Sequence, residues 1–64
     1  MDNKKLAEIL YLAGYTDSVI AACLRGDRIH IVTPYSAEAA EEFADIEYDT
    51  VCTDDGEFIV AVER

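Results

Sequence analysis

Residues 54–62 read DDGEFIVAV, a polar turn followed by an unbroken apolar run. The glycine supplies the backbone freedom that a tight turn needs, and the aromatic and β-branched residues after it favour a strand. Because side chains alternate along a strand, Phe58, Val60 and Val62 share one face, which we predict to be the core face. Residues 46–53, before the turn, are also strand-like, so the two segments predict a β-hairpin.

A second glycine turn occurs in residues 25–32, RGDRIHIV, and is also followed by an apolar run. The segment before it, Ser18–Leu24, fits two interpretations. Its short, continuous apolar run favours a strand that pairs with residues 28–32 in a second hairpin. Alternatively, Thr16 or Asp17 could cap a helix here, which the alanines would suit. The repeated pattern of turn glycine, acid and apolar strand in the two halves favours the hairpin.

The N-terminal segment predicts a helix that begins at a cap, Asp2 or Asn3, and runs to about residue 13. Gly14 stands where a left-handed helix stop is needed, and Tyr15 is placed to fold back on the last turn. The apolar residues of this helix recur at i, i+3, i+4 and i+7 and form one stripe: Leu6, Ile9, Leu10 and Ala13.

A second helix is predicted between the two hairpins. It begins at Thr33-Pro34 or at Ser36, because proline is tolerated in a first helical turn, and it continues to about Asp45. Its buried face is mostly alanine, which lets a helix lie close to a sheet: Ala37, Ala40, Phe43 and Ala44.

Together these segments predict a single α+β domain over residues 1–64, with two helices packed on one face of a small antiparallel β-sheet. The predicted order is αββαββ, or ααβαββ if Ser18–Leu24 is helical. Exposed sheet edges can pair between chains, so we expect a monomer or a weak dimer.

Composition supports a folded chain outside the membrane. Hydrophobic residues make up 52% of the 64 residues, although a chain of this size buries only about 60% of its unfolded surface. No apolar run approaches the roughly 20 residues that cross a bilayer. The N-terminus also lacks the apolar core and cleavage site of a signal peptide. We therefore expect a cytoplasmic protein.

Few residues could carry chemistry. Cys23 and Cys52 are expected to be buried as small apolar side chains, with a disulfide as the alternative. Without a Cys-x-x-Cys motif, and with His30 as the single histidine, no metal site is expected. Residues 54–57, DDGE, lack the calcium-loop pattern and fit a turn better. The chain has no nucleophile, zinc or phosphate-loop motif, so we expect neither an enzyme nor a cofactor.

Charge is the outstanding feature, with a net charge of −9 at pH 7. Residues 1–35 hold four acidic and four basic residues, whereas residues 36–64 hold ten acidic residues and only Arg64 as a base. The whole negative excess therefore lies in the second half. Direct binding to nucleic acids or anionic membranes needs the opposite sign, so neither is expected.

The acidic residues are spaced as a surface. On the predicted second helix they stand three and four positions apart, which places neighbours about 5–6 Å apart on one face. Glu47 and Asp49 project about 7 Å apart from one face of the predicted strand. Three more acids cluster at the hairpin turn. The candidate residues are Glu38, Glu41, Glu42, Asp45, Glu47, Asp49, Asp54, Asp55 and Glu57.

This surface is interpreted as a binding site for a basic partner. Like charges four residues apart on a helix each cost a few tenths of a kcal/mol, and no Lys or Arg occurs between Ser36 and Glu63 to relieve them. The alternative is a solvated face that only keeps the protein soluble. A binding surface of this kind would attract its partner over long range and weaken with salt.

The tyrosines offer a second set of contacts. Tyr11 lies off the apolar stripe of the first helix, and Tyr35 precedes the second helix, so both are candidate interface residues. Packing at the rim of the core is the alternative. Tyr48 lies between Glu47 and Asp49 and, in a regular strand, faces the core.

The small size, one-sided acidic charge and absence of enzyme motifs resemble the phage-encoded inhibitors of bacterial defence. These are the anti-CRISPR and anti-restriction proteins, several of which mimic DNA. The resemblance covers the whole chain in size, charge and architecture, and includes no sequence motif. It implies an inhibitor whose carboxylates replace phosphates in the Lys/Arg-lined channel of a DNA-binding complex, most simply a CRISPR effector.

Two other functions remain open on the sequence. One is an acidic regulatory or adaptor module that docks on a basic protein without mimicking DNA. The other is a domain whose binding site is the open face of the sheet. The three make different predictions. DNA should compete with a mimic for its partner, and should join an adaptor and its partner in a ternary complex. Binding at a sheet-face site should be unchanged by charge reversal on the second helix.

Overall fold

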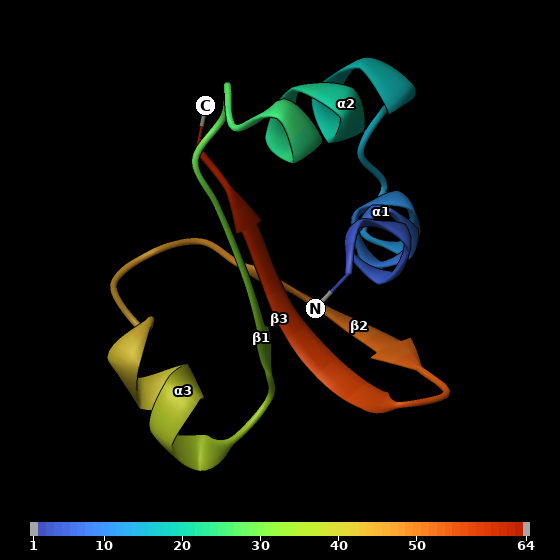
Figure 1. Cartoon of the computed structure of the whole chain (residues 1–64). Helices are drawn as coiled ribbons and strands as arrows, with labels where there is room; N and C mark the ends of the chain where they lie inside the picture. Colours follow the sequence, from blue (N-terminus) through green and yellow to red (C-terminus); the bar gives the residue numbers. More distant parts are fainter. Residues whose placement is uncertain (1, 64) are drawn as a thin grey trace.

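The computed structural model describes residues 2–63 and contains, within them, three helices and three strands (Figure 1). The elements are α1 (Asn3–Leu12), α2 (Asp17–Arg25), β1 (His30–Pro34), α3 (Ala37–Glu42), β2 (Asp49–Thr53) and β3 (Gly56–Val62). The strands form one antiparallel sheet with β3 between β1 and β2. The predicted α+β class is confirmed, and the order is the alternative one, ααβαββ.

The favoured hairpin of Ser18–Leu24 with residues 28–32 is wrong, because the first of these segments is α2. Both ends of this helix are capped. The Thr16 hydroxyl oxygen accepts a hydrogen bond from the Val19 amide at 3.3 Å. At the other end, Gly26 adopts a left-handed conformation with a φ of 82°. The glycine that the sequence placed at a hairpin tip therefore terminates a helix.

The charges and spacing of α2 explain the helix. Asp17 lies in its first turn and Arg25 in its last, and both signs complement the helix dipole. Ile20 and Cys23 stand three residues apart and are both buried. A continuous apolar run has no period of its own, so these flanking signals decide between helix and strand.

Helix α1 follows its prediction. The Asp2 carboxylate accepts a hydrogen bond from the Lys5 amide at 2.8 Å and caps the helix. Ile9 and Leu10 are fully buried, and the rest of the predicted stripe packs around them. After the helix, the Tyr15 amide donates to the Leu10 carbonyl at 3.2 Å, which is the predicted fold-back.

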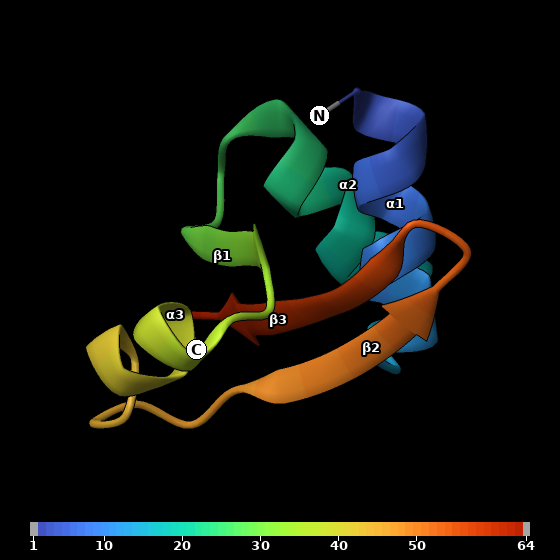
Figure 2. The same ribbon diagram turned by 90° about the horizontal axis from the view of Figure 1, so that it is seen from below.

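Strand β3 is the centre of the fold. Phe58 and Val60 are buried with Val51 of β2 against α1 and α2, which confirms the predicted core face. Ile59, between them, is fully buried on the opposite face. Figures 1 and 2 show α1 and α2 on one side of the sheet and α3 on the other. Two helices thus pack on one face, but they are α1 and α2. The central acidic helix, predicted to share that face with the first helix, lies across the sheet from them.

The second half departs from its predicted boundaries. Helix α3 ends at Glu42 rather than near residue 45, and β2 begins at Asp49 rather than Ile46. Ala37 and Ala44 are exposed rather than buried. Alanine side chains bury little apolar area, and two carboxylates in the last turn oppose the helix dipole. A longer helix therefore has little to stabilise it.

The two cysteines lie in different environments. Cys23 is buried in the core as predicted, whereas the predicted burial of Cys52 is wrong. Adjacent residues of β2 point in opposite directions, so Val51 faces the core and Cys52 faces away. Both thiols are free, and the alternative of a disulfide does not hold.

Candidate acidic binding surface

The nine candidate carboxylates are all exposed, but they do not form one continuous face. Figures 1 and 2 show α3 and the β2–β3 turn well apart, toward different ends of the molecule. The carboxylates form an α3 set (Glu38, Glu41, Glu42 and Asp45), a strand set (Glu47, Asp49 and Glu57) and a turn set (Asp54 and Asp55).

The α3 set is the densest of the three. The Ser36 hydroxyl oxygen accepts an amide hydrogen bond at 3.0 Å and starts the helix. Glu38, Glu41 and Glu42 are three and four residues apart, so their side chains are neighbours on one side of α3. Asp45 does not continue this helix as predicted and lies in the turn that follows it.

The charges of the α3 set work against the helix that carries them. Glu38 lies in the first turn, where the dipole favours an acid, but Glu41 and Glu42 lie at the opposite end. The ion pairs found among residues 2–63 involve only Lys5 and Arg25 as bases. Within this part of the chain, the α3 set therefore has no counter-charge. Such an arrangement costs stability.

The strand set divides. Glu47 precedes β2, so the predicted alternation of Glu47 and Asp49 on one strand face is wrong. Both residues instead line one hollow of about 480 Å³ at the end of the sheet. Glu57 lies apart, at the start of β3 and opposite Cys52 of β2. The hollow is lined by Tyr15, Ile46, Glu47, Tyr48, Asp49 and Val62.

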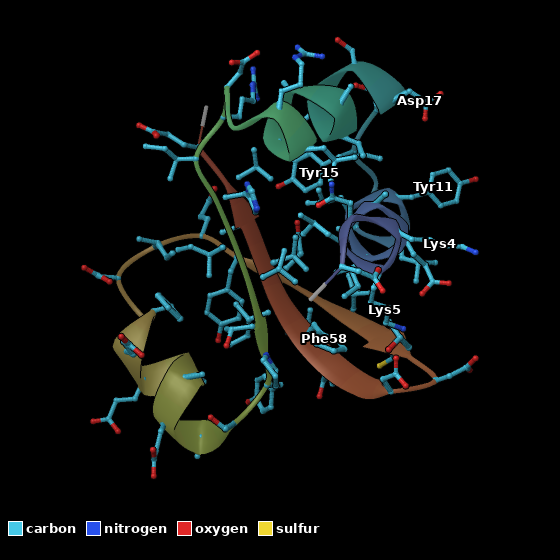
Figure 3. All side chains as sticks on the ribbon, in the orientation of Figure 1. Lys4, Lys5, Tyr11, Tyr15, Asp17 and Phe58 are labelled. Carbon is cyan, nitrogen blue, oxygen red and sulfur yellow. The ribbon has the colours of Figure 1, made fainter. Side chains whose placement is uncertain are left out.

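The turn set is partly neutralised by α1. The Lys5 ammonium lies 2.8 Å from the Asp55 carboxylate and 3.1 Å from that of Glu8. The Lys5 side chain is 21% exposed and that of Asp55 67%, and Figure 3 shows Lys5 beside the β2–β3 turn. The hydrogen bond to Asp55, then that to Glu8, raises the pKa of Lys5. Asp55 thus ties the hairpin to α1, a role that no local pattern in the sequence indicates.

The bases lie away from the α3 set. Within residues 2–63 they are Lys4 and Lys5 on α1, Arg25 at the end of α2, and Arg28 just before β1. Arg25 is itself paired with Asp27 at 3.0 Å. Because α3 lies across the sheet from α1 and α2 (Figures 1 and 2), the charge asymmetry of the sequence is also an asymmetry in space.

The tyrosines fall into two groups. Tyr11 is 68% exposed and projects outward from α1 (Figure 3), and Tyr35 is exposed as well. Tyr48, predicted for the core, is half-buried and lines the hollow. This hollow was not predictable from the sequence, because residues 46–48 were predicted to lie within the strand and β2 begins only at Asp49. A second hollow of about 300 Å³ adjoins it and shares Ile46, Glu47 and Val62.

Other kinds of site find little support in the geometry. Among residues 2–63, no three His, Cys, Asp or Glu side chains are grouped closely enough to hold a metal ion. No helix in the same residues has the length and apolar character to cross a membrane. Comparison with protein-family models, curated proteins and solved structures found no match to this chain. The candidate site is therefore identified only from the charge and the shape of this chain.

Proposed function

We propose that this chain is a non-enzymatic inhibitor that binds the basic, nucleic-acid-binding surface of a bacterial defence complex and blocks access to DNA. A CRISPR effector is the first partner to test, in the cytoplasm of the bacterial host. The proposal is carried by the acidic surface, which we define as the α3 set with Glu47 and Asp49. These carboxylates are exposed, and the sheet separates the α3 set from the bases of α1 and α2.

The chemistry of the acidic groups supports competition with DNA. Carboxylates accept the same charge-assisted hydrogen bonds from Arg and Lys that phosphates accept. The acidic surface therefore suits a channel lined by those side chains, and occupation of the channel excludes the nucleic acid.

A folded surface also has an energetic advantage over DNA. Helix α3 is already capped by Ser36 in the free protein, so less ordering accompanies binding. DNA, in contrast, is bent or melted by many of the proteins that read it, at a cost of several kcal/mol. Asp55 is not part of this surface, because its carboxylate is paired with Lys5.

Capture followed by DNA elution tests the proposal. The immobilised chain is incubated with lysate of a bacterium that carries a CRISPR system, and bound complexes are eluted with short duplex DNA. We expect a nucleic-acid-binding complex to be released by DNA. Its purified form should then lose DNA binding when this chain is added.

Two variants serve as controls. A charge-reversed variant (Glu38→Lys, Glu41→Lys, Glu42→Lys and Asp45→Lys) should capture nothing that DNA releases. A neutral variant, with Gln or Asn at the same positions, should show intermediate capture, and circular dichroism checks that both are folded. Capture that ignores both DNA and charge reversal would overturn the proposal.

An adaptor function is favoured by one observation. Tyr11 is exposed on α1, across the sheet from the α3 set, and offers a second contact surface. An adaptor bound through that surface leaves the DNA channel of its partner open. A ternary complex of partner, DNA and this chain, seen by size-exclusion chromatography, would identify this alternative.

A further inference from the structure

The sheet ends unevenly beside the start of β2. Strand β3 pairs with β1 as far as Val62, opposite His30, but β2 begins at Asp49, opposite Val60. On the β2 side, therefore, no strand residue is paired with Val62. Residues 46–48 pass this end of the sheet without joining it, and together with Val62 they line the hollow of about 480 Å³.

Two hydrogen bonds establish which way the Val62 backbone faces. The Tyr35 amide donates to the Glu57 carbonyl at 2.8 Å, and the Glu63 amide donates to the Ile29 carbonyl at 2.9 Å. Backbone groups alternate in direction along an antiparallel strand, so Glu57, Glu63 and every second residue between them face β1. Val62 therefore directs its N–H and C=O toward the hollow, where no strand within residues 2–63 pairs with them.

The lining of the hollow combines three kinds of surface. Tyr15 and Tyr48 contribute half-buried rings, and Ile46 contributes an apolar side chain. Asp49 is exposed and forms no ion pair within residues 2–63. Glu47 adds further negative charge, and no basic side chain of the described residues lines the space. Acceptors beside aromatic and aliphatic surface are the surroundings that a guanidinium prefers.

We propose that this hollow binds an arginine side chain presented by the basic partner. The inference rests on the proposed function and names the residue type that the acidic surface recognises. The methylene stem packs on Ile46 and Val62, and the guanidinium plane lies against a tyrosine ring. Its fork of donors reaches both the Asp49 carboxylate and the Val62 carbonyl oxygen. A lysine ammonium lacks the planar fork and fits this arrangement less well.

A second hollow lies directly beside the proposed arginine site. It shares Ile46 and Val62 with the first and continues past Ile29 and Ile31, where its lining is mostly apolar. Ile29 is among the most exposed large apolar side chains of the described residues.

A nuclear magnetic resonance titration of the full chain tests the arginine site. The probes are acetyl-Gly-Arg-Gly-amide and its lysine counterpart, each with a single cation, in about 0.15 M salt to screen distant charges. The arginine probe should shift the amides of Tyr48, Asp49 and Val62 in a saturable way and bind more tightly than the lysine probe. Asp49→Asn should weaken it roughly fivefold or more. Asp54→Asn removes the same charge from the β2–β3 turn, outside the acidic surface, and should leave it within about twofold.

The outcomes separate this inference from the proposed function. Equal affinity for both probes, or equal losses in Asp49→Asn and Asp54→Asn, overturns the arginine site and leaves the inhibitor proposal standing, since that needs only charge. Absence of shifts at Asp49 and Val62 overturns the site as well. Selective arginine binding together with a captured partner that ignores DNA keeps the arginine site and overturns the proposed inhibition.

Discussion

The acidic segment, residues 36–48, and the rest of the molecule differ in how they are held in the fold. The buried residues all lie on α1, α2, β2 or β3, and none falls between Leu24 and Thr50. Residues 36–48, which carry the α3 set and Glu47, contribute no buried side chain. Most of their side chains are exposed, and Phe43 is the largest apolar one that is half-buried. The acidic surface is thus attached to a scaffold that other segments stabilise. Its carboxylates can change with little effect on the fold.

Local charge rules separate the same two regions. In α2, an acid stands in the first turn and a base in the last, and both signs stabilise the helix. In α3, Glu41 and Glu42 stand at the negative end of the dipole, with no base in the last turn. The charges of α2 therefore stabilise their helix, whereas the charges at the end of α3 destabilise theirs. Departures from local rules of this kind are expected at functional or strained sites.

Truncation of apolar side chains should show the difference between the core and residues 36–48 most strongly. Ile9→Ala removes a fully buried side chain and should lower the free energy of unfolding by about 2–5 kcal/mol. Phe43→Ala removes a larger but half-buried side chain and should cost about 1–2 kcal/mol. Urea denaturation followed by circular dichroism measures both. Equal losses would mean that residues 36–48 belong to the cooperative core.

Removal of helix caps should give a smaller contrast. Thr16→Ala deletes the cap of α2 and should lower the free energy of unfolding by about 1 kcal/mol. Ser36→Ala deletes the cap of α3 and should instead speed amide exchange within α3, about fivefold, with little change in global stability. Thr16→Ser keeps a hydroxyl and is the control. A global loss in Ser36→Ala as large as that in Thr16→Ala would contradict the separation.

The sequence predicted the parts of the fold that rest on clear periodicity. The α1 stripe, its stop at Gly14, and the core face of Phe58 and Val60 are all present. The apolar run before Gly26 has no period, so only the caps at its two ends, Thr16 and Gly26, distinguish a helix from a strand. Exposure of the acidic residues was predictable from charge.

The grouping of the acidic residues was not predictable. The pair of Lys5 with Asp55 joins distant parts of the chain and appears only when α1 packs beside the hairpin. The hollow beside Asp49 arises because β2 starts later than its apolar pattern suggests, which leaves Val62 without a strand partner on the β2 side among residues 2–63. Both features follow from how elements meet rather than from any one element.

Charge reversal within α3 should change local stability in opposite directions at its two ends. Glu42→Lys places a base at the C-terminal end, complements the dipole and should slow α3 amide exchange about two- to fivefold. Glu38→Lys makes the same charge change in the first turn and should speed exchange by a similar factor. Each variant should also weaken partner capture. If Glu42→Lys destabilised α3, its carboxylate would have a structural role that the binding proposal does not include.

Loss of the pair of Lys5 with Asp55, which joins the hairpin to α1, should have the smallest effect on stability, and that effect should depend on pH. The pKa of Lys5 is raised in the folded protein above its ordinary value of 10.5, chiefly by the hydrogen bond to Asp55. The pair therefore stabilises the fold fully below about pH 10.5, and this contribution is lost as the pH rises through the higher folded pKa. Asp55→Asn removes the larger cause. Its melting temperature should be lower than that of the natural chain at about pH 8, and the gap should narrow toward about pH 11.

The neighbouring residue makes this measurement specific. Asp54→Asn changes the same turn but removes no ion pair found among residues 2–63, so the gap between its melting temperature and that of the natural chain should not narrow in the same way. Any other group that titrates in this range is common to all three chains and cancels in the comparison. A parallel narrowing in Asp54→Asn would show that the turn is held by its net charge rather than by Lys5. The turn set would then belong with the α3 set, and the pair of Lys5 with Asp55 would not be what holds the hairpin to α1.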